Sequence, residues 1–230
     1  MTPRTRPRER EGEILDATRA LFDEHGVDDV RVARIARVAG INKALIYRHF
    51  SSKEELFVLT VTRYLAEIER ELATVDAGAL GPEDALAEIT DRYAAYCLRH
   101  PAFLDLALLL MRRPFAQLAA RVSDGVLLRL GRAMAGCLGP TAAVLAEGTR
   151  RNAFAVQDPD RGANHLYTQA LGTLHLARLG VGLRRAANGA PETFPVDPGS
   201  VRRAVVEDAL AHARGGREAD SVLRGRRTTA

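Results

Sequence analysis

The 230-residue sequence has few cysteines, only two lysines and no run of alternating polar and apolar residues. Its two cysteines, Cys97 and Cys137, lack the spacing of a metal site, and this usage suits a reducing compartment such as the cytoplasm. Arginine accounts for 31 of the 33 basic residues, and the net charge of +4 permits an anionic partner without requiring one. The 47% hydrophobic content can bury a sizeable core, which excludes global disorder.

Neither an export signal nor a membrane span is apparent. Residues 1–10 carry four arginines with no apolar run behind them, unlike a signal peptide. These arginines fit a solvated arm, although such arms can also reach a phosphate or the minor groove; they are Arg4, Arg6, Arg8 and Arg10. Residues 162–183 contain a single charge, Arg178, but polar residues interrupt them, so we expect no membrane partner.

Motifs that carry catalysis are also missing. The sequence has no GxSxG nucleophile elbow, no HExxH zinc motif and no phosphate-binding P-loop. Gly180-Val181-Gly182 lacks the third glycine of a dinucleotide fingerprint and falls within an expected helix. None of the six histidines lies four residues from another, so no helical metal pair is present. We therefore expect no enzyme, no cofactor and no metal.

Helical periodicity fills the N-terminal region. We expect helices at about residues 14–25, 32–39, 43–50 and 52–72. Gly26 and Gly40 stand where helices end, because glycine tolerates positive φ. Asn42 can cap the third helix, and Ser52 with Glu55 forms a capping box for the fourth.

The rest of the chain is expected to be helical as well. Its helices are predicted at about residues 83–99, 103–112, 115–138, 141–156, 161–187 and 201–213. Prolines such as Pro140 mark boundaries, because proline lacks an amide donor. The stretch 188–200 is rich in proline and glycine and is predicted to be a loop, with Asp197 capping the last helix.

Two short helices joined by Gly40, Ile41 and Asn42 have the layout of a helix-turn-helix, whose second helix lies in the DNA major groove. Off its buried face, this helix presents basic, aromatic and small side chains, namely Lys43, Ala44, Leu45, Tyr47 and Arg48. Lys53 lies in the first turn of the next helix, where its positive charge interacts unfavourably with the positive end of the helix dipole. A bound phosphate would offset this unfavourable interaction, because it accepts hydrogen bonds from the lysine and from the free amides of the helix start. The pattern predicts DNA binding, with a purely structural corner as the alternative.

Residues 32–56 resemble the DNA-binding signature of the TetR family of transcriptional regulators, and the similarity covers roughly residues 14–57. Gly40, Tyr47, Phe50 and the Ser52-Lys53-Glu54 cap all fall in register with that signature. The resemblance implies an all-helical homodimer that binds palindromic operators in double-stranded DNA. It also implies that a small effector in the C-terminal domain releases the DNA.

The resemblance assigns DNA contacts by position. Base edges or sugars would be contacted by Lys43, Ala44 and Leu45. Phosphates would be contacted by Tyr47, His49 and Lys53. Arg48 would lie near the groove, and Asn42 would cap the recognition helix. Leu45 stands where the family often has a hydroxyl residue, so contact with a thymine methyl is the better expectation. His49 could instead pack beneath the helix.

Arg31 is a second departure from the family pattern. It stands where a serine or threonine often caps the helix, so we expect Asp28 or Asp29 to cap it. Arg31 would then be available to reach a phosphate.

The C-terminal part offers apolar helix surface for an effector. Residues 103–111 are apolar on all sides apart from Asp105, as in a helix enclosed by others. The candidate pocket residues are Tyr93, Tyr96, Cys97, Phe103, Leu106, Leu110, Met111, Phe115, Leu118, Val122, Asn152, Phe154 and Gln157. Their types favour a hydrophobic or aromatic effector, while ordinary core packing is the alternative for each.

Residues 161–187 and 201–213 are the candidate dimerisation helices. The former has too many apolar positions for one face, and small residues such as Gly172 would allow close backbone approach. The candidate interface residues are Leu166, Ala170, Leu171, Leu174, Ala177, Val181, Val201, Val205 and Leu210. A two-fold dimer would present recognition helices to half-sites about 34–36 Å apart. Burial within one chain is the alternative.

The expected fold is therefore all-α. Residues 1–55 would form a three-helix helix-turn-helix domain, residues 56–214 a helical effector-binding and dimerisation domain, and residues 215–230 a disordered tail. The predicted function is a ligand-responsive regulator, most simply a repressor released from a palindromic operator by a small hydrophobic or aromatic effector. The alternative is a DNA-binding dimer without such an effector, controlled by a protein partner.

Overall fold

The computed structural model describes residues 7–112 and 114–227, with side chains over residues 9–112 and 114–215. The chain forms two compact units, residues 1–67 with 100–134, and residues 68–99 with 135–230. The predicted boundary at residue 55 divides the chain by sequence order. The compact units instead combine distant segments, because residues 100–134 fold with the N-terminal helices.

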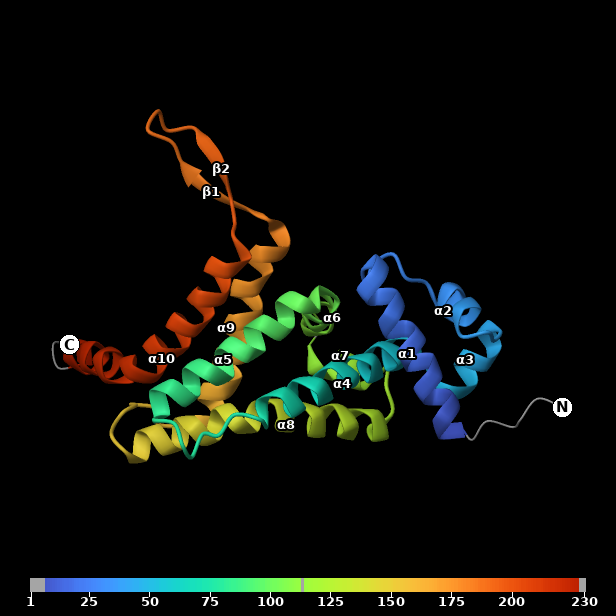
Figure 1. Cartoon of the computed structure of the whole chain (residues 1–230), viewed down its shortest axis with the longest axis horizontal. Helices are drawn as coiled ribbons and strands as arrows, with labels where there is room; N and C mark the ends of the chain where they lie inside the picture. Colours follow the sequence, from blue (N-terminus) through green and yellow to red (C-terminus); the bar gives the residue numbers. More distant parts are fainter. Residues whose placement is uncertain (1–6, 113, 228–230) are drawn as a thin grey trace. The chain divides into compact units, whose positions relative to one another are not determined.

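The first unit is built from helices, and aromatic side chains lie in its core. The helices, labelled in Figure 1, are α1 (Pro7–His25), α2 (Val32–Val38), α3 (Lys43–His49), most of α4 (Lys53–Leu72), α6 (Pro101–Met111), α7 (Phe115–Ala119) and the start of α8 (Asp124–Arg150). Phe22 of α1 packs edge-on against Phe57 of α4, with ring centroids 5.0 Å apart. Tyr64 is fully buried beside Phe103, at 5.7 Å between centroids. Together these rings fasten α4 to α1 and α6.

The second unit is organised around α5 (Pro82–Arg99). It also contains the ends of α4 and α8, α9 (Pro159–Leu179), β1 (Val181–Arg185), β2 (Pro191–Pro195) and α10 (Pro198–Arg227). Helix α5 packs against both α9 and α10. Leu86, Leu171 and Leu174 are completely buried in this core. With this mainly helical architecture, the all-α prediction is confirmed.

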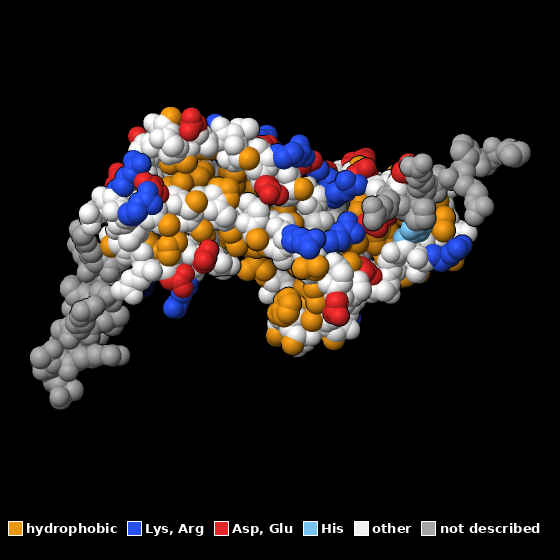
Figure 2. Space-filling view, turned by 90° about the horizontal axis from the view of Figure 1, so that it is seen from below, with side chains coloured by type: hydrophobic (Ala, Val, Ile, Leu, Met, Phe, Trp, Pro, Cys, Tyr) orange, Lys and Arg blue, Asp and Glu red, His pale blue; other side chains and the backbone are white. Residues whose placement is uncertain are grey.

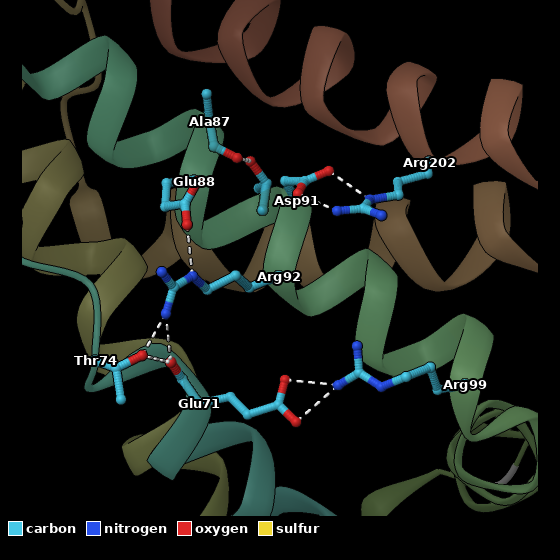
Figure 3. A network of polar contacts seen from close by, with 9 residues as sticks. Glu71, Thr74, Ala87, Glu88, Asp91, Arg92, Arg99 and Arg202 are labelled. Carbon is cyan, nitrogen blue, oxygen red and sulfur yellow. Dashed lines mark hydrogen bonds and ion pairs between the residues drawn. The ribbon is translucent and has the colours of Figure 1, made fainter.

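Ion pairs reinforce both sides of α5 (Figure 3). Arg99 donates to both carboxylate oxygens of Glu71, near the end of α4, at 2.7 and 2.8 Å. On α10, Arg202 forms a two-point pair with Asp91, whose Nε–Oδ1 distance is 2.5 Å. Arg202 joins two guanidinium nitrogens to the two carboxylate oxygens of Asp91, and such two-point pairs restrict orientation as well as distance. Arg99 contacts both Glu71 oxygens from one nitrogen, so it links α5 to α4 without fixing the orientation in the same way.

The predicted helices at residues 115–138 and 141–156 are wrong. The structure has a short α7 that ends at Ala119 and one continuous α8 that runs through Pro140. A proline inside a helix removes one hydrogen bond and costs about 3 kcal/mol. Cys137, Val144 and Leu145 are buried around Pro140, so tertiary packing holds the helix together across it.

The prediction of a helix over residues 161–187 followed by a loop is also wrong. Helix α9 ends at Leu179 because Gly180 adopts a left-handed conformation, with φ of 70°. Strand β1 then pairs antiparallel with β2, and Val181 lies opposite Pro195. The hairpin projects beyond α9 and α10 (Figure 1). Its turn contains Asn188-Gly189, a dipeptide typical of hairpins that the periodicity did not reveal.

Helix α10 is longer than expected. Asp197 caps it as predicted, since its carboxylate accepts from the Ser200 N–H at 2.7 Å. Residues 215–227 continue the helix where the composition predicts a disordered tail. Four arginines in that stretch favour helix and three glycines disfavour it, so composition alone does not decide its structure. Residues 228–230 of the expected tail lie outside the described residues.

Candidate nucleic-acid interface

A four-residue connection, Ala39 to Asn42, joins α2 to α3. Gly40 has φ of 66°, a left-handed conformation that glycine adopts without steric strain. The Ile41 N–H donates to the Ala36 carbonyl at 2.9 Å, and the Gly40 N–H donates to the Arg37 carbonyl at 3.2 Å. This pair of bonds satisfies the last carbonyls of α2 and ends it sharply. The chain can therefore start α3 only a few residues later, as a helix-turn-helix requires.

The start of α3 is capped as predicted. The Asn42 side chain accepts from the Leu45 N–H at 2.8 Å, which confirms the expected cap. Ile46 and Phe50 are each 1% exposed and hold one face of the helix against the unit. A seven-residue helix is too short to be stable alone. Its orientation is therefore set by the cap and these two buried side chains.

The start of α2 differs from the prediction. Arg31 occupies the capping position and its side chain makes no capping bond, so the expected cap by Asp28 or Asp29 is wrong. Val30 is 1% exposed and anchors the chain immediately before the helix, which leaves Arg31 as the first flanking residue. The Arg31 side chain is exposed to solvent.

The residues predicted to contact DNA are mostly accessible. Seven are exposed and two, Leu45 and His49, are half-buried; the exposed residues are Arg31, Asn42, Lys43, Ala44, Tyr47, Arg48 and Lys53. Tyr47 is 44% exposed, and the Lys43 ammonium lies 5.7 Å from its ring centroid. The outward face of α3 therefore combines positive charge with an accessible aromatic hydroxyl.

The start of α4 carries the predicted capping box in a modified form. The Ser52 hydroxyl accepts from the Glu55 N–H at 2.9 Å, as expected. The Glu55 carboxylate reaches back to the Ser51 N–H at 2.5 Å and also accepts from the Ser51 hydroxyl. Its other oxygen accepts from the Ser123 hydroxyl at 2.7 Å. Burial acts to raise the pKa of Glu55, but the hydrogen bonds from Ser51 and Ser123 lower it overall.

Glu55 should make the stability of the protein depend on acid pH. Because its pKa is lowered in the folded chain, the stabilisation is present above the ordinary glutamate pKa of about 4.3 and is lost as pH falls further. We expect Glu55→Gln to lower the free energy of unfolding by roughly 1–3 kcal/mol at pH 7, with a smaller difference at pH 3. Urea unfolding at both pH values measures this. An equal difference at both would show that the carboxylate charge is not what stabilises the site.

A segment far away in sequence secures the start of α4, and sequence reasoning missed it. The Ser52 hydroxyl donates to the Arg121 carbonyl at 2.7 Å, and the Arg121 side chain pairs with Glu54 at 3.0 Å. More than sixty residues separate these partners, so no local pattern could reveal them. On α2, Arg37 and Val38 beside the turn are exposed as well.

The arginines of the predicted N-terminal arm are only partly described. Arg4, Arg6 and the side chain of Arg8 lie outside the described residues. Arg10 pairs with Glu13 on α1 at 2.6 Å. Its role in the arm therefore stays a prediction.

The predicted pocket residues are divided between the two units. The first unit contains Phe103, Leu106, Leu110, Met111, Phe115, Leu118 and Val122, and the second contains Tyr93, Tyr96, Cys97, Asn152, Phe154 and Gln157. Met111 is 47% exposed and Phe115 is 68% exposed. Of the whole set, Tyr93 alone lines the small cavity among α4, α5, α8 and α9 in the second unit.

Most of the predicted interface residues are covered by their own chain. Six of the nine are buried, namely Leu166, Ala170, Leu171, Leu174, Val201 and Val205. Packing among α5, α9 and α10 provides that cover, so burial within one chain accounts for these six. Ala177 and Leu210 are half-buried, and Val181 is 51% exposed.

The described part of the chain contains neither a cluster of metal ligands nor a single helix that could span a membrane. No group of three or more His, Cys, Asp or Glu side chains there could hold a metal ion. Cys97 and Cys137 are free and buried, and burial raises the pKa of Cys137 to about 12. No single helix in that part is long and apolar enough to cross a membrane, and α5 and α6 pass such a test only when taken together.

Residues 14–59, which contain the helix-turn-helix, match the family described as bacterial regulatory proteins, tetR family. The match covers the DNA-binding part of the chain, which is therefore similar to that of TetR-family regulators. A curated relative, the HTH-type transcriptional repressor NicS of Pseudomonas putida, is 31% identical over 93 residues, which are 40% of this chain and 44% of NicS. The match therefore spans less than half of that relative.

Solved structures resemble the chain over most of its length. A structure from Mesorhizobium loti MAFF303099, described as a TetR-family regulator, has a TM-score of 0.56 and 25% identity, covering 90% of this chain and 98% of that one. RolR, solved with the ligand resorcinol, has a TM-score of 0.60 and 17% identity, covering 90% and 94%. The second likeness establishes the fold alone.

Proposed function

We propose that this protein is a TetR-type transcriptional regulator that binds operator DNA as a homodimer, most simply as a repressor. The observation that carries the proposal is the outward face of α3, where Lys43, Tyr47 and Arg48 are exposed on a capped helix after a sharp turn. Basic and aromatic side chains in that position suit phosphates and base edges. NicS is named as a repressor, which supports repression over activation.

A second part of the proposal is release by a small hydrophobic or aromatic effector. The resorcinol complex of RolR supports a small-molecule ligand on this fold. The effector would bind more tightly to a conformation in which the two recognition helices are wrongly spaced for the DNA half-sites. This difference in its affinity for the two conformations would couple effector binding to release of the DNA. Helix α4 contributes residues to both units, so a shift of α4 would transmit the conformational change from one unit to the other. The alternative is control by a protein partner, and loss of DNA binding on adding a ligand separates the two.

The outward face of α9 and the hairpin are the proposed self-association surface. Five of the ten exposed large hydrophobic side chains among the described residues lie within residues 176–194; they are Leu176, Leu179, Val181, Leu183 and Phe194. Further back on α9, Asn164, Thr168 and Gly172 are exposed and uncharged. Depletion of charge is typical of the centre of a protein interface. This face is therefore the best candidate for contact with a second copy.

Titration of the purified protein with DNA from upstream of its own gene, at two salt concentrations, tests the proposal. We expect tight binding to one palindromic fragment that weakens as salt rises, because phosphate contacts release counterions. Weak binding that does not depend on the DNA sequence would indicate that the operator does not lie upstream of the protein's own gene. Failure to bind any DNA at low salt would refute the proposed regulator.

Lys53→Ala should weaken DNA binding at every sequence. Lys53 is exposed, with its ammonium 4.7 Å from the Phe57 ring centroid at the start of α4. Losing one phosphate contact per subunit should flatten the slope of log K against log salt by about 0.9 per contact, or about two for a dimer. Lys53→Arg is the control, because it keeps the charge and should keep most of the slope. An unchanged slope in Lys53→Ala would remove this lysine from the phosphate contacts.

A further inference from the structure

Two histidines from distant parts of the sequence meet on the surface of the second unit. His165 lies on α9 and His212 on α10, and their imidazole rings stack with centroids 4.5 Å apart and 25° between the ring planes. His165 is exposed and His212 is half-buried, so ions in solution can reach the pair. Sequence periodicity does not reveal it, because the two side chains come together only through the packing of α9 against α10.

The stacked arrangement suits a metal ion better than a pair of protonated rings. Two imidazolium ions at 4.5 Å would repel each other, so stacking favours the neutral form. A neutral imidazole keeps one ring nitrogen without a proton, and this nitrogen is the commonest protein ligand of transition metals. The χ2 torsion of histidine is broad, so a rotation about it can turn a nitrogen of each ring toward one shared ion.

Fixed charges next to the pair offset each other. Asp208 lies one turn before His212 on α10, and Arg161 lies one turn before His165 on α9. Figure 2 shows that basic and acidic side chains also lie close together on the face of the molecule drawn there. The ligands that the pair offers are therefore imidazole nitrogens rather than a group of carboxylates. Such ligands favour Zn²⁺ over Ca²⁺ or Mg²⁺, which prefer oxygen.

Two imidazoles supply only half of a zinc site. Structural Zn²⁺ almost always takes four ligands in a tetrahedral arrangement, and no group of three or more metal-binding side chains occurs in the described part of the chain. His165 lies two turns before Gly172, on the α9 face proposed for self-association. A two-fold axis through this face would duplicate the pair and bring the number of imidazoles to four.

We propose that His165 and His212 form half of a Zn²⁺ site, and that the same pair of a second copy completes it. The ion joins α9 and α10 of one copy to those of the other and so stabilises the dimer. Zn²⁺ therefore raises operator affinity, because only the dimer contacts both half-sites. This inference rests on the proposed function, since it requires self-association through α9, and adds a dependence on metal to it.

Untagged full-length protein, freed of metal with EDTA and then titrated with Zn²⁺, tests the site. Equilibrium dialysis should give one ion per two chains. In sedimentation equilibrium, free Zn²⁺ at a hundred times its Kd should lower the dimer dissociation constant about a hundredfold, because the complete site exists only in the dimer. His165→Ala and His212→Ala should each abolish this effect. His175→Ala is the matched control, because His175 lies on the same helix outside the pair, and it should keep the effect.

Co²⁺ supplies a second readout, because it absorbs visible light strongly in a tetrahedral site and only weakly in an octahedral one completed by water. We expect the tetrahedral spectrum in the wild type and its loss in His165→Ala. One Zn²⁺ per chain or an octahedral spectrum would overturn the shared site, and an unchanged response in both alanine variants would overturn the assignment to this pair.

Operator binding with EDTA present separates the site from the proposed function. Tight operator binding by a metal-free dimer that does not respond to Zn²⁺ would reject the site and retain the regulator. Failure to bind any DNA, with the effect of Zn²⁺ on dimerisation intact, would reject the regulator and retain the site.

Discussion

The Gly172→Arg variant should be monomeric and should bind a palindromic operator at least about a hundredfold more weakly than the wild type. Gly172 is exposed on the face of α9 proposed for self-association. A Cβ atom built at this position meets nothing within 4 Å, so an arginine fits the folded chain. In a homodimer through α9, the same arginine would prevent close approach of the two helices and bury a charge. The second half-site contact would then be lost.

Gly131→Arg is the matched control for this variant. Gly131 is also exposed in the middle of a helix, α8, and a Cβ there likewise meets nothing within 4 Å. Both substitutions replace a helical glycine by arginine, so they share the same propensity gain and added charge. Sedimentation equilibrium should give a dimer for Gly131→Arg and a monomer for Gly172→Arg. A dimeric Gly172→Arg protein with normal operator affinity would exclude this face of α9 from the interface.

Helix starts in this chain could be predicted because their determinants are local. Asn42, Ser52 and Asp197 all cap the helices assigned to them, since each bond joins atoms three residues apart. The turn at Gly40 is equally local, because it depends on one left-handed residue. The whole helix-turn-helix lies within such short-range interactions. This is why its layout followed from the sequence.

Long-range packing explains what could not be predicted. Pro140 is a strong boundary signal on its own, and only the side chains packed around it keep α8 continuous. The contacts of Arg121 and Ser123 with the start of α4 join residues more than sixty positions apart. Cavities depend on the same kind of packing. The sequence therefore indicated apolar helices in the C-terminal part but not which of their residues surround the cavity.

The apolar surface of α9 illustrates a further ambiguity. Leu171 and Leu174 are fully buried by their own chain, whereas Leu176 and Leu179 on the same helix are 44% and 56% exposed. Periodicity reports that a side chain avoids water, not which molecule covers it. The sequence-based interface consequently combined core residues with surface residues. The burial values separate the two groups and move the proposed contact to the exposed side.

Tyr47→Ala should reduce operator affinity by about two to four orders of magnitude at moderate salt. The resemblance to TetR regulators implies that the Tyr47 hydroxyl bonds to a DNA phosphate, and hydrogen bonds to charged groups contribute about 1.5–3 kcal/mol each. A two-fold dimer loses two such bonds, so the effect on the binding free energy doubles. Because Tyr47 is 44% exposed, the folded protein should keep its melting temperature within a few degrees.

Tyr47→Phe identifies the part of the side chain that contributes. This variant keeps the ring that lies 5.7 Å from the Lys43 ammonium and removes only the hydroxyl. A loss as large as that of Tyr47→Ala would assign the effect to the phosphate bond. A smaller loss would assign the remainder to the ring, which positions Lys43 or packs on the sugar. Normal binding by Tyr47→Ala at unchanged stability would contradict the docking of α3 on DNA, since Tyr47 lies at the centre of its exposed face.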